Sequence, residues 1–196
     1  MKNIANLLFE AKMLKEIPRS GFHFLGSGKE SIAEHTFSTT FIAYVLAQLQ
    51  PDVDALKLIS MCLVHDLAEA RTGDLNSVHK VYVTADETKA LEDTTCKLPF
   101  GSAITDLIQE FNQNSSVEAR LAHDADQLAL VVDLKALADL GYRSPSKWLP
   151  PVVRRLTTDT GRQLANVSST ASSGDPGRRF SERPRSLNSS ELMPRT

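Results

Sequence analysis

The chain contains 196 residues, 41% of them hydrophobic, and has a formal net charge of -2. This length and composition favour a single globular domain with a hydrophobic core of its own. The charge leaves no broad basic surface, which argues against a nucleic-acid polymer as partner. It does not argue against a small anionic ligand held by a local site.

The N-terminus, the apolar runs and the cysteines together predict a cytoplasmic protein. The first residues form an amphipathic pattern without the long apolar core and small-residue cleavage site of a secretory signal. No stretch approaches the roughly 20 apolar residues that a bilayer-crossing helix needs, so we expect no membrane contact. Cys62 and Cys96 lack a paired C-x-x-C spacing, which fits a reducing compartment.

Two helices are expected in the first part of the chain. Apolar residues recur at helical spacing over residues 4–14, and this helix should end before Pro18, which disfavours helical backbone at the preceding residue. After a glycine-containing loop, Ser31 and Glu34 have the spacing of a capping box. The second helix therefore begins next to Ser31 and carries His35 in its first turns.

A third helix contains the most informative pair of residues. Asp54 is placed to cap it, and the apolar pattern continues through His65 and Asp66 to about Ala70, before a glycine at position 73. Burying an imidazole beside a carboxylate costs free energy unless each group is paired or coordinates a cation. The pair therefore predicts a divalent metal near the carboxyl end of this helix.

The middle of the chain is also predicted to be helical. Residues 78–83 alternate loosely and are compatible with a short extended segment, but one such segment does not make a sheet. Two helices are expected over 86–97 and 102–111, followed by a long helix that begins after Ser116 and ends at Gly141. The fold class is therefore all-α.

The carboxyl-terminal part is predicted to divide into a last helix and a tail. A helix start is interrupted by the two prolines at 150–151, so the last helix is expected to begin after them and run to about Ala165. The segment that follows is rich in Ser, Arg and Pro, and such segments bury too little surface to offset the entropy of ordering. We expect a helical bundle of about six to seven helices over residues 1–165 and a disordered or aberrant tail over 166–196.

Four potential metal ligands come from three of these helices, as in bundles whose side chains meet around an internal metal site. They are His35, His65, Asp66 and Asp126. Two imidazoles and two carboxylates suit Mn, Co, Fe, Ni or Zn better than Ca or Mg, which prefer oxygen ligands alone. Such a site leaves room for water and a phosphate oxygen, which is the arrangement that a phosphohydrolase needs.

The same residues stand in motifs that resemble those of a known family, the HD-domain metal-dependent phosphohydrolases. The matching segments are Ser31 to His35, His65 to Glu69, Thr72 to Asp74 and Ala125 to Leu128. Residues 17–22 resemble the loop that precedes the first ligand in the 5'-deoxynucleotidase branch, and the match covers roughly residues 1–164. The resemblance implies an all-helical, usually dimeric enzyme that removes the 5'-phosphate from deoxyribonucleoside monophosphates with a divalent ion.

The resemblance also distributes roles among these residues. It assigns the metal ligands to His35, His65, Asp66 and Asp126 and the acid/base carboxylate to Glu69. Glu69 follows Asp66 by three residues and His65 by four, so on a continuous helix it shares their face. From there it can orient a water or protonate a leaving oxygen.

Asp124 and His123 are rivals of Asp126 on the same predicted helix, and the Ala-Asp-x-Leu motif selects Asp126. Residues two apart on a helix point about 200° apart, so Asp124 serves at most as an outer partner of the metal. Trp148 has the spacing of a helix-packing aromatic residue. We therefore predict a core or dimer contact for it rather than stacking on a base.

Two further residues receive roles from the resemblance. Arg19 corresponds to a phosphate-binding arginine, whose planar fork of donors suits a terminal phosphate; a loop arginine in solvent is the plain alternative. Asp74 corresponds to a carboxylate that accepts a hydrogen bond from the sugar 3'-hydroxyl, but Gly73 and Asp74 also fit a helix-ending turn. Phe22 and Ser20 differ from the residues common at these positions in the family, so the choice between deoxyribose and ribose stays open.

Three functions are compatible with these features. The leading hypothesis is an enzyme that hydrolyses (deoxy)ribonucleoside 5'-monophosphates with metal-activated water, a nucleotide as its small-molecule partner and a homodimer as its assembly. The second keeps the site but changes the substrate to a deoxynucleoside triphosphate, guanosine tetraphosphate or a cyclic dinucleotide. The third is a non-enzymatic module in which a metal staples helices. The intact His-Asp-x-x-Glu motif and the Arg19 loop favour the first.

Overall fold

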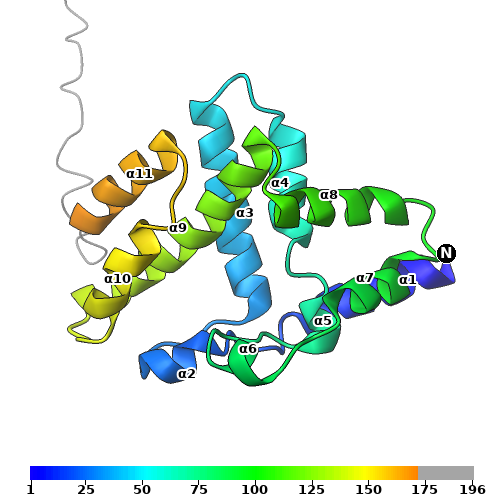
Figure 1. The fold of residues 1–196 in the computed structure, drawn as a ribbon, viewed down its shortest axis with the longest axis horizontal. Helices are drawn as coiled ribbons and strands as arrows, with labels where there is room; N and C mark the ends of the chain where they lie inside the picture. Colours follow the sequence, from blue (N-terminus) through cyan, green and yellow to red (C-terminus); the bar gives the residue numbers. More distant parts are fainter. Residues whose placement is uncertain (172–196) are drawn as a thin grey trace, which may run out of the picture.

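The computed structural model describes residues 1–171. The regular secondary structure within these residues is entirely helical (Figure 1). They are α1 (Lys2–Met13), α2 (Gly21–Leu25), α3 (Ile32–Leu49), α4 (Ala55–Val64), α5 (Glu69–Thr72), α6 (His79–Tyr82), α7 (Glu87–Thr95), α8 (Gly101–Gln113), α9 (Val117–Asp139), α10 (Pro145–Val153) and α11 (Asp159–Thr170). The predicted all-α class is confirmed. The helices outnumber the six to seven expected because α2, α5 and α6 are short helical turns and because α10 and α11 are separate.

The longest helix, α9, runs through the middle of the molecule (Figure 1). It packs against α3 and α4, against α8, and against the carboxyl-terminal pair α10 and α11. The main hydrophobic core lies where α3, α4 and α9 meet. Its large, fully buried side chains are Leu46, Leu58, Met61, Leu121 and Leu128. This core fixes the three helices that carry the predicted metal ligands.

The helix starts predicted from capping residues are confirmed. Ser31 and Glu34 form a complete capping box on α3: Ser31 Oγ accepts from the Glu34 N–H, and the Glu34 carboxylate accepts from the Ser31 N–H. Asp54 caps α4 and Ser116 caps α9 through bonds from the backbone N–H three residues on. These bonds satisfy amides that a helix start otherwise leaves unpaired, so they fix where His35 enters the bundle.

The third predicted helix is interrupted at the His-Asp pair, so the expectation that it continues to Ala70 is wrong. α4 ends at Val64, and turns with backbone bonds between residues three apart lead to α5, which begins at Glu69. On a regular helix, neighbouring side chains point about 100° apart. Here His65 Nε2 and Asp66 Oδ2 nevertheless lie 3.2 Å apart, because both side chains turn toward the same point.

Two further expectations are corrected. Residues 78–83 hold the helical turn α6 and not an extended segment. The prolines at 150–151 lie inside α10, and the chain leaves helical structure only after them, before α11. Each proline removes one backbone donor, so carbonyl groups in the first turn of α10 lack their usual helical partners.

The end of α11 differs from the predicted end of the last helix. α11 continues past Ala165, which is fully buried, to Thr170. Residues 172–196, which make up most of the expected tail, lie outside the described residues. Within residues 1–171, no helix is long and apolar enough to cross a membrane.

Candidate metal centre

Three helices bring His35, His65 and Asp126 to one point. His35 lies in the first turns of α3, His65 follows the last residue of α4, and Asp126 lies within α9. One potential ligand atom from each of these side chains lies within 4.8 Å of those from the other two. His35 is fully buried, and its Nε2 is 2.9 Å from Asp126 Oδ1. Residues far apart in the chain thus converge as a metal site in a bundle requires.

Asp66 joins this group. Its Oδ2 lies 3.2 Å from His65 Nε2 and 3.9 Å from His35 Nε2. All four residues predicted as metal ligands therefore meet in one place, and we call them the His-Asp cluster. Two imidazoles and two carboxylates make a mixed nitrogen and oxygen set, which suits a divalent transition metal.

Two buried atoms of the His-Asp cluster face each other without a hydrogen bond. His65 Nε2 and Asp66 Oδ2 have no hydrogen-bond partner among the described residues, although they are 3.2 Å apart. His65 Nδ1 lies 2.8 Å from the Cys62 carbonyl and donates to it, which leaves Nε2 as the nitrogen that faces the cluster. Buried polar atoms without partners are costly. A divalent cation between them would remove that cost, so these residues fit a metal.

The charges of the cluster also favour a positive ion at its centre. Burial by itself lowers the pKa of His65, but the interactions with Asp66, with Asp126 and with the Cys62 carbonyl together outweigh burial and raise the pKa to about 9. Burial by itself raises the pKa of Asp126, but the interactions with His35, His65 and Arg19 together outweigh burial, so the net pKa is lowered. Both effects mean that this buried space stabilises a cation next to charged carboxylates.

Glu69 begins α5 beside the cluster and is half-buried. Its Oε2 is buried and has no hydrogen-bond partner among the described residues. Burial, together with the negative charges of Asp66 and Asp74, raises the pKa of Glu69 to about 9. The turns at 65–68 place Glu69 beside the cluster. Because α4 is interrupted, Glu69 does not share one continuous helix face with His65 and Asp66.

Arg19 reaches the cluster from the loop between α1 and α2. Its Nη1 lies 3.7 Å from Asp66 Oδ2, and its side chain is only 20% exposed. The Arg19 backbone N–H donates to the Glu30 carbonyl at 2.8 Å, which ties this loop to the segment before α3. The alternative of a loop arginine in solvent therefore does not describe this residue. Its guanidinium lies where a group bound at the cluster would meet it.

Asp74 lies directly after Gly73, the residue that ends α5 with a left-handed φ of 73°. Asp74 Oδ2 accepts a hydrogen bond from the Ser20 backbone N–H at 2.5 Å. Ser20 Oγ in turn accepts from the backbone N–H of Asn76 at 3.1 Å. Asp74 thus follows a helix-ending turn, as one of its two interpretations has it, and its carboxylate also bonds the loop that carries Arg19. The contact with a sugar 3'-hydroxyl stays a prediction.

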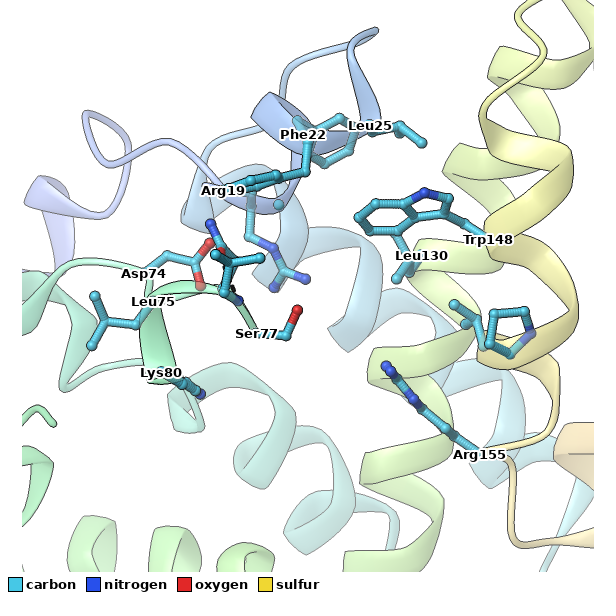
Figure 2. Close-up of a pocket in the computed structure, with 16 residues that line it drawn as sticks. Arg19, Phe22, Leu25, Asp74, Leu75, Ser77, Lys80, Leu130, Trp148 and Arg155 are labelled. Carbon is cyan, nitrogen blue, oxygen red and sulfur yellow. Dashed lines mark hydrogen bonds between the residues drawn. The ribbon is translucent and has the colours of Figure 1, made fainter. Parts of the chain in front are cut away.

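A cavity of about 620 Å³ opens beside Arg19 (Figure 2). Figure 2 shows Arg19 and Asp74 on one side of the cavity and Leu130 and Trp148 on the other. Its charged lining residues are Arg19, Asp74, Lys80 and Arg155. We call this space the Arg19 cavity. Its balance of charge favours an anionic ligand.

A second cavity, of about 690 Å³, reaches His65 from between α7 and α8. Its charged lining residues, apart from that histidine, are all acidic: Glu87, Glu92 and Asp106. A phosphate group would be repelled there. The Arg19 cavity, whose lining includes the arginine that lies 3.7 Å from Asp66, is therefore the better place for an anion.

Sequence reasoning missed two residues near the site. Trp148, predicted to serve only in packing, lines the Arg19 cavity. Glu30 Oε2 lies 3.8 Å from His35 Nδ1, and burial together with the charge of Asp133 raises the pKa of Glu30 to about 8. This separation exceeds hydrogen-bond distance, and His35 Nδ1 has no hydrogen-bond partner among the described residues. The position of Glu30 next to the helix cap was the only local signal, and no sequence motif distinguished it.

The rivals Asp124 and His123 do not join the cluster. Asp124 is fully buried and faces the start of α11, where its two carboxylate oxygens accept from the backbone N–H groups of Thr157 and Thr158, each at 2.8 Å. His123 Nε2 lies 2.8 Å from the Phe111 carbonyl, and the two rings stack. The proposed role of Asp124 as an outer partner of the metal is therefore replaced by a structural one.

The sequence profile of the HD domain matches residues 11–167 of this chain. This match spans most of the chain and includes every residue of the His-Asp cluster. The chain belongs to the HD domain family. The predicted resemblance is thereby confirmed, and it agrees with the helical bundle and with the cluster after which the family is called.

Comparison with individual proteins gives modest sequence identities over most of the chain. It is 25% identical to the 5'-deoxynucleotidase HDDC2 of Mus musculus over 180 residues, 84% of this chain and 89% of that protein. It is 27% identical to the 5'-deoxynucleotidase HDDC2 of Danio rerio over 146 residues, 71% of this chain and 72% of that protein. A solved structure of a conserved hypothetical protein from Pyrococcus furiosus is similar with a TM-score of 0.72 at 27% identity, covering 84% of this chain and 98% of that one.

Proposed function

We propose that this protein is a metal-dependent phosphohydrolase that removes the 5'-phosphate from (deoxy)ribonucleoside monophosphates. The observation that carries the proposal is the convergence of His35, His65, Asp66 and Asp126, with Arg19 Nη1 3.7 Å from the Asp66 carboxylate. A cation site with an arginine fork beside it binds a terminal phosphate well. The relatives named 5'-deoxynucleotidase support this substrate class.

The residues of the His-Asp cluster would hold one divalent transition metal, with Mn, Co, Fe, Ni and Zn as candidates. When bound, such an ion polarises the phosphorus and lowers the pKa of a coordinated water. The chain's own part is to orient the ligands: the Cys62 carbonyl accepts from His65 Nδ1 and thereby fixes the His65 ring.

Arg19 and Glu69 have complementary tasks in this proposal. Arg19 neutralises the phosphate oxygens from the wall of the cavity and holds the phosphate in line for attack. Glu69, half-buried and with an unpaired oxygen, donates a proton to the departing 5'-oxygen. Asp74 lines the Arg19 cavity, where its carboxylate accepts from the Ser20 N–H of the Arg19 loop. It also offers an oxygen to the sugar 3'-hydroxyl.

The alternative hypotheses receive less support. A module in which a metal only joins helices needs neither the unpaired Glu69 oxygen nor Arg19 beside the cluster. Larger nucleotides would place additional phosphates in the Arg19 cavity, where Lys80 and Arg155 are the remaining cationic residues and both are exposed. We further propose a homodimer, as the family resemblance implies, and a cytoplasmic location, which the spacing of Cys62 and Cys96 favours.

Phosphate release from a panel of deoxyribo- and ribonucleotides tests the proposal. The full-length protein is assayed with added Mn²⁺ or Co²⁺ and with a chelator. We expect release from monophosphates that depends on the ion. Asp66→Ala should lose both metal binding and turnover, whereas Glu69→Ala should lose turnover and still bind metal. No release with any ion and any nucleotide favours the non-enzymatic module, and equal behaviour of both variants contradicts the assigned roles.

A further inference from the structure

The wall of the Arg19 cavity opposite Arg19 is apolar and aromatic. It is formed by Trp148 and Pro151 from α10 and by Leu130 from α9. Figure 2 shows the Trp148 ring directed from α10 toward Arg19, with Leu130 next to it. Trp148 is half-buried, so part of its surface stays open to the cavity. An aromatic face open to a cavity is a stacking surface for a flat ligand.

We propose that Trp148 is the surface on which the nucleobase of the substrate stacks, so that it determines how the enzyme distinguishes a nucleotide from a bare sugar phosphate. This inference rests on the proposed function. The phosphate is held at the Arg19 end beside the His-Asp cluster, so the base must extend away from it. The cavity of about 620 Å³ falls within the range of roughly 300–1,000 Å³ that is usual for small-molecule sites.

The basic groups of the cavity add a second feature. Lys80 and Arg155 are exposed and line the cavity, and their side chains offer only hydrogen-bond donors. A stacked base presents ring nitrogens and carbonyl oxygens as acceptors at its edge. Stacking on one aromatic face tolerates every base because each has a π-face. The site therefore recognises a nucleobase as a class, with Trp148 as the main contact.

The second cavity lacks these features. No Phe, Tyr or Trp lines it, and its only basic side chain is His65. Trp148 also packs against the cluster of apolar residues that contains Val131 and Val152, so a structural role is the rival explanation. The experiments must separate base stacking from packing.

Trp148 is the single tryptophan of the chain, so its fluorescence reports directly on this cavity. The full-length protein is titrated with deoxyadenosine, with deoxyadenosine monophosphate in the presence of chelator, and with 2-deoxyribose 5-phosphate. We expect saturable quenching by the first two ligands and none by the third. This binding measurement does not depend on turnover. Absence of quenching by both base-containing ligands overturns the stacking role, even in an active enzyme.

Kinetic measurements on Trp148 variants provide the second test. Trp148→Ala should lower kcat/KM for deoxyadenosine monophosphate by at least about tenfold, or about 1.4 kcal/mol, and leave kcat/KM for 2-deoxyribose 5-phosphate unchanged. Trp148→Phe keeps an aromatic face and should retain most of the activity. Tyr142→Ala removes an exposed aromatic residue that does not line the cavity, and serves as the matched control.

The outcomes separate the two proposals. If Trp148→Ala lowers kcat/KM for both substrates equally, with a lowered unfolding temperature, its role is packing and the inference is wrong. If the wild type releases phosphate from neither substrate yet deoxyadenosine still quenches Trp148, the proposed hydrolysis fails and the base site stands. Quenching by 2-deoxyribose 5-phosphate as strong as by deoxyadenosine also contradicts a base-specific contact.

Discussion

Two aspartates of α9 lie two residues apart and have different surroundings. Asp124 is fully buried, and its carboxylate accepts from the backbone N–H and the hydroxyl groups of Thr157 and Thr158. Asp126 is half-buried; its Oδ1 lies 2.9 Å from His35 Nε2, its Oδ2 accepts from Gln127 Nε2 at 2.8 Å, and neighbouring atoms of the cluster lack hydrogen-bond partners among the described residues. The protein alone satisfies Asp124, whereas the proposed function assigns Asp126 to a group that a cation would complete.

This difference gives a physical criterion for separating structural from functional carboxylates. A structural carboxylate saturates its lone pairs with N–H and O–H donors, which compensates for the cost of burial. A metal-binding carboxylate instead directs at least one oxygen toward other ligand-type atoms, as Asp126 does toward His35 and His65, even where its second oxygen accepts a hydrogen bond from Gln127. Asp124 therefore stabilises the junction of α9 and α11, whereas Asp126 serves the His-Asp cluster. Substitutions at the two positions should have separable effects on stability and on metal binding.

The largest expected effect is the loss of metal binding in Asp126→Ala. Even contacts outside the ligand sphere contribute about 10–100-fold to metal affinity, so removal of a ligand should weaken Mn²⁺ binding by more than about 100-fold and abolish phosphate release. Calorimetric titration with Mn²⁺ measures the affinity. A bound ion stabilises the folded state, so the rise in unfolding temperature on adding Mn²⁺ should also disappear. Mn²⁺ affinity within a few-fold of wild type would exclude Asp126 as a ligand.

A smaller effect, and one of a different kind, is expected for Asp124→Ala. It leaves the N–H and hydroxyl groups of Thr157 and Thr158 without their acceptor, which should lower the free energy of unfolding by about 3 kcal/mol. For a chain of this length that corresponds to a fall in unfolding temperature of roughly 6–12 °C. Mn²⁺ affinity, measured well below that temperature, should be unchanged. Loss of Mn²⁺ affinity without loss of stability would assign Asp124 to the metal site.

The smallest of the three effects is expected for Gly161→Ala, which tests the same junction from α11. A Cβ at Gly161 would lie 2.3 Å from Asp124 Oδ2. Alanine normally stabilises a helix relative to glycine by about 1 kcal/mol, but this contact should reverse the sign and destabilise the protein by about 1–3 kcal/mol. Thermal unfolding measures the change, with Gln163→Ala on the exposed face of α11 as control. A stabilised Gly161→Ala protein would mean that the Asp124 junction is loose.

Most of the local structure was predictable from the sequence. The capping residues Ser31, Asp54 and Ser116 each mark a helix start, because a cap needs only a side chain and the backbone three residues on. A candidate metal pair was also recognisable, since adjacent His65 and Asp66 in an apolar segment require compensation; their role as ligands stays a prediction. Both kinds of signal are contained within a few neighbouring residues.

The interrupted helix at the His-Asp pair was not predictable in this way. The apolar pattern continues through residues 65–70, and local preferences therefore favour one helix. The same limit applies to Trp148 and to Glu30, whose surroundings are made by distant segments. Their side chains look like ordinary packing and surface groups until those segments are in place.

The sequence by itself determined that the protein is all-α, where its principal helices begin, and which residues are candidates to bind a metal. Only the tertiary structure decided that α4 ends before Glu69, that Asp124 of α9 accepts hydrogen bonds from the start of α11, and that Trp148 lines the Arg19 cavity. The physical reason is the range of the interactions. Caps and periodicity act between residues near in the chain, whereas burial, cavity walls and the partners of a buried carboxylate depend on contacts across it.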